Sequence, residues 1–235
     1  MLQRPLGVQD RPVAERQSWS KMAEEMLDEK KRLEKRKLLI KAAAKGYYTD
    51  LLATRKFAGK TWIAPKVMIR GDKALYFPNM YGTALTGGKV HTTDLCQGKV
   101  SIIAILSTRM SEIQTANFVK SAHEEHKDKP GYQFIQINLQ ENLLRSLLVS
   151  MFTSGIKRSV PEELWPTYMV SNQNMDYVRD DLGMTNRHIG YIYLVDEQCR
   201  VRWAGCADPR PEEMEALRVC AGVLLKRHEP LPSKA

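Results

Sequence analysis

The segment from Gly190 to Cys206 constrains the fold of this chain more than any other stretch. It contains two runs rich in β-branched and aromatic residues, Ile189–Val195 and Arg200–Trp203, on either side of the polar stretch Asp196-Glu-Gln. Such runs separated by a short polar turn are typical of two antiparallel strands. The sequence therefore predicts a β-hairpin that closes a larger sheet late in the chain.

Upstream of the hairpin, the pattern predicts a strand, a helix and a second strand. The run Val100–Leu106 is apolar and β-branched, which is typical of a strand buried on both faces. Ser111 and Gln114 form a capping-box pattern. The helix face that follows is expected to consist of Ile113, Ala116, Val119 and Ala122. Pro130-Gly131 breaks the chain before a predicted strand at Gln133–Asn138.

Three further helices are expected around these strands. One has apolar residues at helical spacing, namely Leu143, Leu144, Leu147, Leu148 and Met151. A second is expected across Met175–Leu182, and Asp208 with Pro209 begins a last helix over roughly residues 210–227. A strand–helix–strand unit favours a parallel pair, and the hairpin adds an antiparallel pair. That order predicts an α/β fold, a thioredoxin-like mixed sheet with covering helices.

The positive charge of the chain is concentrated near its start. The formal net charge is +9, and residues 1–60 hold 15 Lys/Arg against 8 Asp/Glu. After an extended arm, we expect a long basic helix over residues 14–45, with an apolar residue every seventh position at Trp19, Met26, Leu33 and Ile40. Such a helix favours an anionic lipid surface, RNA or an acidic partner. A solvated helix in a basic compartment fits the same charge.

These patterns divide the chain into four parts. Residues 1–59 are the arm and the basic helical segment, residues 60–99 a connecting region that wraps the core, residues 100–228 the thioredoxin-like domain, and residues 229–235 a tail. The connecting region is broken by Pro and Gly and shows no persistent helical or alternating pattern. The longest strictly apolar run, Ile102–Leu106, is far shorter than the ~20 residues that span a bilayer.

The loop where a thioredoxin-like fold carries its redox cysteines contains none. It reads Ser107-Thr-Arg-Met-Ser111, and His188-Ile-Gly190 stands where such a site has a proline before the third core strand. Thiol–disulfide chemistry needs a thiolate of lowered pKa at a helix N-terminus. We therefore expect the redox motif to be absent.

The four cysteines of the chain show neither C-x-x-C nor zinc-ligand spacing. We expect all four to be free thiols. Cys199 and Cys206 lie seven residues apart in mostly extended chain, and this odd offset predicts that they occupy opposite faces.

No other catalytic template fits the sequence. It contains no G-x-x-x-x-G-K-[ST] and no G-x-S-x-G, and its histidines lack metal-ligand spacing. We predict a protein without enzymatic activity, cofactor or metal. Arginine and aromatic residues gather near the hairpin, as expected of an interface, and they are Arg179, Arg187, Tyr191, Tyr193, Arg200, Arg202 and Trp203. Composition leaves open the alternative of a core tryptophan rimmed by solvated arginines.

Six segments together resemble a known family. They are Lys73-Ala-Leu-Tyr-Phe-Pro-Asn79, Gly98-Lys-Val-Ser101, Gln136-Ile-Asn138, Leu182-Gly-Met-Thr-Asn186, Gly190-Tyr-Ile-Tyr-Leu-Val-Asp196 and Cys199-Arg-Val-Arg-Trp-Ala-Gly-Cys206. The family is that of the mitochondrial ATPase-complex assembly factors called ATP-ten, with the fungal members most similar, including the opening Arg4-Pro-Leu-Gly7. The resemblance runs over roughly residues 60–226.

The resemblance implies a chaperone that helps to build the membrane (F0) sector of ATP synthase. It implies contact with newly made, mitochondrially encoded subunit a (subunit 6), possibly with the c-ring, at the matrix side of the inner membrane. Residues 14–45 would meet the membrane surface, and no nucleic acid is expected. Such proteins carry an Arg- and Ser-rich presequence, for which Met1–Asp10 is too short and broken by proline. We expect the following residues to contact partners: Tyr76, Phe77, Pro78, Asn79, Arg179, Asn186, Arg200, Arg202, Trp203 and Cys206.

Two alternatives stay open. The chain is a divergent thioredoxin-like or peroxiredoxin-like oxidoreductase if it uses Cys199 or Cys206, an idea that the double variant Cys199→Ser, Cys206→Ser tests. It is an RNA-binding protein if residues 14–45 bind RNA with steep salt dependence. On the leading hypothesis, Trp203→Ala and Arg202→Glu abolish ATP synthase assembly and leave the fold intact.

Overall fold

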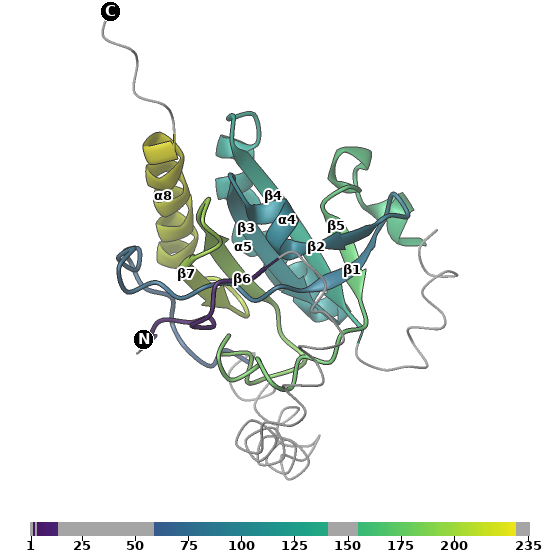
Figure 1. Ribbon diagram of the computed structural model, residues 1–235, viewed down its shortest axis with the longest axis horizontal. Coiled ribbons are helices and arrows are strands. Elements are labelled where there is room, and N and C mark those ends of the chain that lie inside the picture. The colour runs from purple at the N-terminus through teal and green to yellow at the C-terminus, as the bar shows by residue number, and fades with distance from the viewer. Residues whose placement is uncertain (1, 3, 14–58, 141–154, 229–235) are drawn as a thin grey trace, which may run out of the picture.

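The computed structural model describes residues 2, 4–13, 59–140 and 155–228. The predicted helices at residues 14–45 and 143–151 and the predicted tail lie outside these residues. The described part of the chain folds around one seven-stranded sheet of order β2-β1-β5-β4-β3-β6-β7 (Figure 1). The strands are β1 (Tyr81–Ala84), β2 (Lys89–His91), β3 (Val100–Leu106), β4 (Tyr132–Leu139), β5 (Tyr168–Ser171), β6 (Tyr191–Val195) and β7 (Val201–Cys206).

The centre of the sheet has the predicted thioredoxin-like arrangement. Strands β3 and β4 are parallel and are joined by helix α5 (Arg109–His126). Strands β6 and β7 form an antiparallel hairpin followed by helix α8 (Pro211–His228). Strand β6 also pairs with β3, in antiparallel direction, so the four strands lie in the order β4-β3-β6-β7. The fold class is therefore confirmed.

The two faces of the sheet are buried by different parts of the chain. Successive residues of a strand point to opposite faces. Ile102 and Ala104 of β3 pack in a cluster with helices α5 and α8. Ile103 and Ile105 belong to a second cluster, which contains residues from the loops and from the short helix α4 (Thr92–Cys96). All seven residues of β3 are buried, as the apolar run predicted.

The connecting region 60–99 has more regular structure than the sequence suggested. Although no helical or alternating pattern persists there in the sequence, β1, β2 and α4 lie in this region. Strand β1 pairs with β5, a strand that the sequence analysis missed. These strands are three or four residues long, so each is too short to show an alternating pattern. The region also supplies Phe77, Met80 and Cys96 to the core.

The helix predicted across Met175–Leu182 is also absent. These residues form consecutive turns, with the Met175 carbonyl accepting from both Val178 N (3.0 Å) and Arg179 N (3.0 Å). The segment ends at Gly183, whose φ of +67° is a left-handed conformation that favours glycine. Met175 and Leu182 are buried, so the apolar pattern identified core residues and assigned them the wrong local structure.

The N-terminal arm extends the edge of the sheet beside β7. Tyr76 pairs with Arg200 at the start of this strand, and Val8 pairs with Tyr76 on the far side. The Gly7 N–H donates to the Asp181 carbonyl at 3.0 Å, and Leu6 is buried in the core. Two segments distant in sequence therefore cover the backbone groups of this edge.

A β-bulge interrupts the pairing of β6 with β7. Leu194 pairs with Trp203 but Val195 pairs with Val201, so Arg202 is the extra residue. The bulge shifts the alternation by one position. As a result, Cys199 and Cys206 lie in the same core cluster, and the prediction of opposite faces was wrong. All four cysteines of the chain are free thiols, as expected.

Candidate protein-interaction site

The loop after β3 is closed by hydroxyl groups. Thr108 is the N-cap of α5: its Oγ1 accepts from Ser111 N at 3.2 Å, and Ser111 Oγ accepts from Thr108 N at 2.9 Å. This reciprocal pair is the capping box, so the predicted pairing of Ser111 with Gln114 was wrong. A side chain that can accept a hydrogen bond at the N-cap satisfies helix N–H groups that would otherwise have no partner. The N-terminus of α5 is thus occupied by hydroxyls of its own chain.

The same hydroxyls attach the loop to residues 187–188. Ser107 Oγ donates to the Arg187 carbonyl at 2.7 Å, and Thr108 Oγ1 donates to the His188 carbonyl at 2.9 Å. No peptide bond in the described residues is cis. Gly190 follows in contact with α5, and its N–H donates to Gln114 Oε1 at 3.0 Å. The two loops that meet at this edge are therefore held together by side-chain hydrogen bonds.

Helix α5 exposes part of the face that the sequence assigned to the core. Ile113 of that face is 52% exposed, and Met110, one turn earlier and not assigned to the face, is 46% exposed. Buried polar groups on the neighbouring face explain the difference, because Gln114 bonds Gly190 and Thr115 Oγ1 donates to the Ser111 carbonyl at 2.9 Å. A search for apolar residues at helical spacing cannot identify the buried face of a helix when the first turns of that face are polar. Two exposed apolar side chains therefore lie on the first turns of α5, a surface that the sequence analysis missed.

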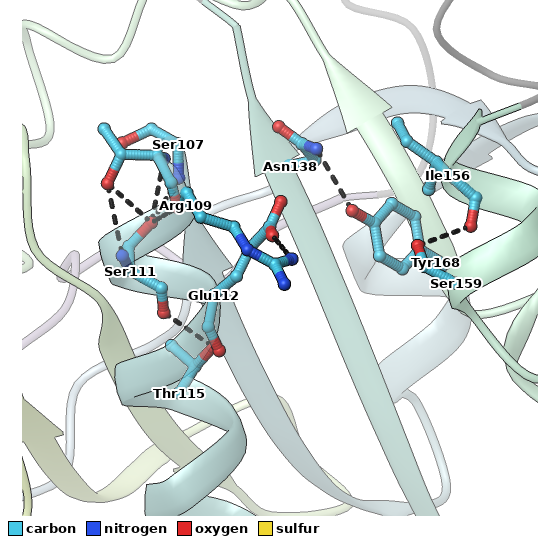
Figure 2. A network of polar contacts seen from close by, with 10 residues as sticks. Ser107, Arg109, Ser111, Glu112, Thr115, Asn138, Ile156, Ser159 and Tyr168 are labelled. Atoms are coloured by element: carbon cyan, nitrogen blue, oxygen red, sulfur yellow. Dashed lines mark hydrogen bonds and ion pairs between the residues drawn. The ribbon is translucent and has the colours of Figure 1, made fainter.

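A polar network lies beside this surface at the carboxyl ends of the parallel strands (Figure 2). On α5, Arg109 Nη1 forms an exposed ion pair with Glu112 at 2.7 Å. At the end of β4, Asn138 Nδ2 donates to the Tyr168 hydroxyl at 3.0 Å. Burial raises the pKa of the Tyr168 phenol to about 12, so this group is neutral at physiological pH. None of the four cysteines of the chain belongs to this network.

The predicted site residues fall into separate groups. Arg179 and Asn186 line a small hollow together with Ser107, next to the loop after β3. Both are at least nine-tenths buried, and Asn186 N donates to the Tyr191 hydroxyl at 2.9 Å. Tyr76 and Arg200 lie instead at the hairpin edge, where they pair. The residues that the sequence analysis grouped together are thus distributed over two parts of the domain.

At the hairpin, a buried ionic cluster holds the connecting region in place. The carboxylate of Asp196 is fully buried, and its Oδ2 accepts from Arg200 Nε and Arg202 Nη1, each at 3.0 Å. The two guanidinium groups also donate to the Ile69 and Gly71 carbonyls, at 2.9 and 3.3 Å. The sequence analysis proposed both arginines as partner contacts and missed Asp196. The spacing of one acid and two arginines around a turn was the signal for this cluster.

Most of the other predicted contact residues are interior. Trp203 and Cys206 are fully buried, and Phe77 and Pro78 are also buried. The Trp203 Nε1–H donates to the Pro65 carbonyl at 2.7 Å, and the ring packs edge-on against Phe118. Truncating a buried Trp to Ala costs about 3–5 kcal/mol. Trp203→Ala is therefore expected to destabilise the fold, contrary to the sequence prediction that it leaves the fold intact.

Three predicted contact residues keep partly exposed side chains. Tyr76 and Asn79 are half-buried, and the Arg200 side chain is 22% exposed. Asn79 joins the arm to the sheet, because its Nδ2 donates to the Val13 carbonyl at 3.3 Å and its Oδ1 accepts from Thr93 N at 3.4 Å. Partner contact at all ten residues stays a prediction, and for the buried ones it would require an indirect effect.

The cysteines do not form an accessible redox centre. Cys199 is 5% exposed and Cys206 is fully buried. Burial raises the pKa of Cys199, and it raises the pKa values of Cys96 and Cys220 to about 12 and about 11. Inert structural cysteines have these properties, whereas reactive ones are exposed and have lowered pKa values.

A second buried ion pair, also missed, joins the start of the connecting region to α8. Lys60 Nζ lies 2.7 Å from Glu213 Oε2, and Glu213 Oε1 accepts from Ala64 N at 2.7 Å. Glu213 also accepts from Arg210 N at 2.8 Å, just before the helix begins at Pro211. The prediction that Asp208 caps this helix was therefore wrong.

The part of the chain that the structure describes contains neither a metal-binding cluster nor a membrane-spanning helix. No cluster of three or more His, Cys, Asp or Glu residues there is placed to hold a metal ion. Within the same residues, no helix combines the length and apolar character needed to cross a bilayer.

The fold and the loop after β3 define the class of the protein, a thioredoxin-like domain with hydroxyls in place of redox thiols. Comparison with known proteins defines the family. The chain belongs to the ATP10 protein family, whose model matches residues 1–224.

The chain is similar to fungal relatives over most of its length and to solved structures over a smaller part. The chain is 30% identical over 234 residues to the mitochondrial ATPase complex subunit ATP10 of Saccharomyces cerevisiae, covering 92% of this chain and 84% of that protein. It is 27% identical over 228 residues to the protein of the same name from Eremothecium gossypii, covering 93% and 83%. Among solved structures, a secreted thiol-disulfide isomerase from Corynebacterium glutamicum is 13% identical with a TM-score of 0.46, covering 68% of this chain and 91% of that one.

Proposed function

We propose that this protein is a non-enzymatic assembly factor of the mitochondrial ATP synthase. It acts on newly made subunit a (subunit 6) of the F0 sector and promotes its association with the c-ring. Membership of the ATP10 family and the names of the fungal relatives support the assembly role. The subunit a target and the place of action, peripheral on the matrix side of the inner membrane, rest on the family resemblance.

The observation that carries a binding role is the chemistry at the start of α5. Where a thioredoxin-like enzyme needs a reactive thiol, this chain has a hydroxyl capping box and, beside it, exposed Met110 and Ile113. Exposed apolar side chains that lie close together are typical of surfaces that bind other proteins. This surface suits the apolar segments that a newly made membrane protein exposes before assembly.

The test combines affinity capture with labelling of new mitochondrial translation products. Tagged protein in isolated mitochondria, after mild crosslinking, should recover labelled subunit a, and the signal should decline during a chase as assembly proceeds. The double variant Met110→Glu, Ile113→Glu should recover at least fivefold less. Val219→Glu is the matched control, because Val219 is 45% exposed on α8, and its recovery should stay within twofold.

Other outcomes refute parts of the proposal. Absence of subunit a from the captured material contradicts the assembly role. Capture of ribosomal RNA instead favours the RNA-binding alternative, and capture of mixed-disulfide partners favours an oxidoreductase. If the α5 variant and the control recover equal amounts of subunit a, the assembly role stands, but Met110 and Ile113 are not its binding site.

The basic segment is proposed to hold the protein at the membrane. Residues 14–45 would bind an anionic surface at ~1 kcal/mol per well-placed Lys or Arg. Full-length protein should float with anionic vesicles at low salt and be released at high salt, while neutral vesicles should not retain it. Equal flotation with both vesicle types contradicts this attachment.

A further inference from the structure

The edge of the sheet at β2 is left open in the described part of the chain. On the opposite side, β7 is extended by residues around Tyr76 and then by Val8. The Val201 N–H, for example, donates to the Leu75 carbonyl at 2.7 Å. Strand β2 pairs with β1 on one side, and within residues 59–140 and 155–228 no strand pairs with its other side. In the described residues, the β7 edge of the sheet is therefore covered by other segments of the chain, whereas the β2 edge is not.

The register shows which backbone groups of β2 point outward. Thr92 N donates to the Met80 carbonyl, and Ala84 N donates to the Gly88 carbonyl, each at 2.8 Å. In an antiparallel ladder, hydrogen-bonded pairs alternate with pairs that exchange no bonds. The pair Gly82–Val90 is therefore bonded, whereas Lys89 and His91 direct their N–H and C=O groups away from β1. His91 is also the N-cap of α4, so its carbonyl accepts the first hydrogen bond within that helix. The Lys89 N–H and C=O and the His91 N–H have no backbone partner among the described residues.

The side chains around this edge also suit an added strand. Val90 packs against the core cluster, so an apolar residue beside it would extend that cluster. On the other face, the Tyr81 and His91 rings are 6.2 Å apart, and Tyr81 is 50% exposed. The neighbouring turn is open, since a Cβ added at Gly87 or Gly88 would meet nothing within 4 Å. Lys89 is exposed and favours an acidic residue opposite.

We propose that β2 accepts an extended segment of the client polypeptide by strand addition. The segment pairs its backbone with the Lys89 N–H and C=O and the His91 N–H, places an apolar residue next to Val90 and presents an acidic residue to Lys89. Outward N–H and C=O groups at strand spacing match another extended backbone. The edge is three residues long, which limits the pairing to a few hydrogen bonds and suits a client that must later be released. This inference rests on the function proposed above and names a second contact for the same client.

The variant Lys89→Pro tests the edge directly. Proline removes the outward N–H of residue 89 and leaves the β1–β2 hydrogen bonds, because the Thr83–Lys89 pair exchanges none. Lys89→Ala is the matched control, since it loses the side chain and keeps the N–H. In the capture assay, Lys89→Pro should recover at least fivefold less labelled subunit a than wild type. Lys89→Ala should recover within threefold of wild type.

Two further measurements keep the outcome decisive. The urea midpoint of each variant shows whether the fold is intact. A photo-crosslinking amino acid at position 89 should form adducts with labelled subunit a, and the same group at exposed Lys99 should not. If wild type recovers the client while position 89 gives no adduct, or while folded Lys89→Pro recovers it equally, the edge proposal is overturned and the assembly role stands. If wild type recovers no client, both are overturned.

Discussion

Replacing Asp196 with asparagine should destabilise the domain strongly. The amide oxygen of Asn can still accept from Gln198 N and Arg200 N, which lie 3.1 and 2.9 Å from Asp196 Oδ1. The amide nitrogen, however, takes the place of Oδ2 and directs its own N–H groups at two guanidinium donors. The variant therefore keeps the turn and removes the negative charge that compensates two largely buried arginines.

The expected magnitude follows from this geometry. Removing one partner of a buried ion pair costs about 3–5 kcal/mol, because the remaining charge stays buried without compensation. Global stabilities are about 5–15 kcal/mol, so this is a large fraction of the total. With a urea m-value of about 2–3 kcal/mol/M, the unfolding midpoint should fall by about 1–2.5 M.

Glu197→Gln is the matched control for Asp196→Asn. It removes the same charge one residue later, at a partly exposed side chain, and should change stability by less than about 0.5 kcal/mol. Raising the salt concentration should leave the Asp196→Asn effect nearly unchanged, because buried pairs are screened little. A loss below about 1 kcal/mol, or one that disappears in salt, would refute the conclusion that this cluster holds the connecting region.

Three further predictions concern other parts of the domain. Gly190→Ala places a Cβ 2.5 Å from Thr115 Cγ2, so its urea midpoint should fall by the equivalent of about 1–3 kcal/mol, whereas Gly155→Ala, with open space, should not. Because burial raises the pKa values of Cys96 and Cys220, iodoacetamide at pH 8 should label the native thiols at least tenfold more slowly than those of the urea-unfolded chain, and rapid native labelling would contradict their burial. Burial lowers the pKa of His123, so the neutral ring contributes stability above its ordinary pKa of 6.5, and this contribution is lost as the pH falls below that value. In urea titrations from pH 7.5 to 5, His123→Gln should therefore lose less stability with falling pH than wild type. An equal loss in both proteins would refute this prediction.

The sequence predicted the centre of the fold better than its edges. The apolar run that became β3 and the strands that flank it are buried on both faces, so their composition alone identifies them. Strands β1 and β2 are too short to show a period, and their pairing with β5 depends on residues distant in sequence. The helix predicted across Met175–Leu182 was wrong for another reason. Its apolar residues are buried, but consecutive turns bury them as well as a helix would.

The candidate site was predicted less well than the fold. Arginine and tryptophan near a hairpin suggested an interface, but Arg202 bonds Asp196 and Trp203 packs beneath α5. A β-bulge at Arg202 decides which way these side chains point, and a bulge leaves no pattern in the sequence. The sequence analysis missed the exposed residues Met110 and Ile113 on α5 because polar residues occupy the buried face there. Gln114 and Thr115 look like surface residues, and their buried hydrogen bonds rotate Ile113 to the outside.

The docking of the N-terminal arm determines the order in which the chain can fold. Leu6 and Gly7 are synthesised early, yet Gly7 bonds Asp181, and Val8 is held by a segment that itself pairs with Arg200. Until that distant part of the polypeptide has emerged, the arm has no place to dock. Contacts of such long sequence separation form slowly, because the intervening loop must close first. The domain therefore completes its fold late, and a chain cut short before the hairpin would leave both the arm and the hydrophobic core beneath it open to proteases.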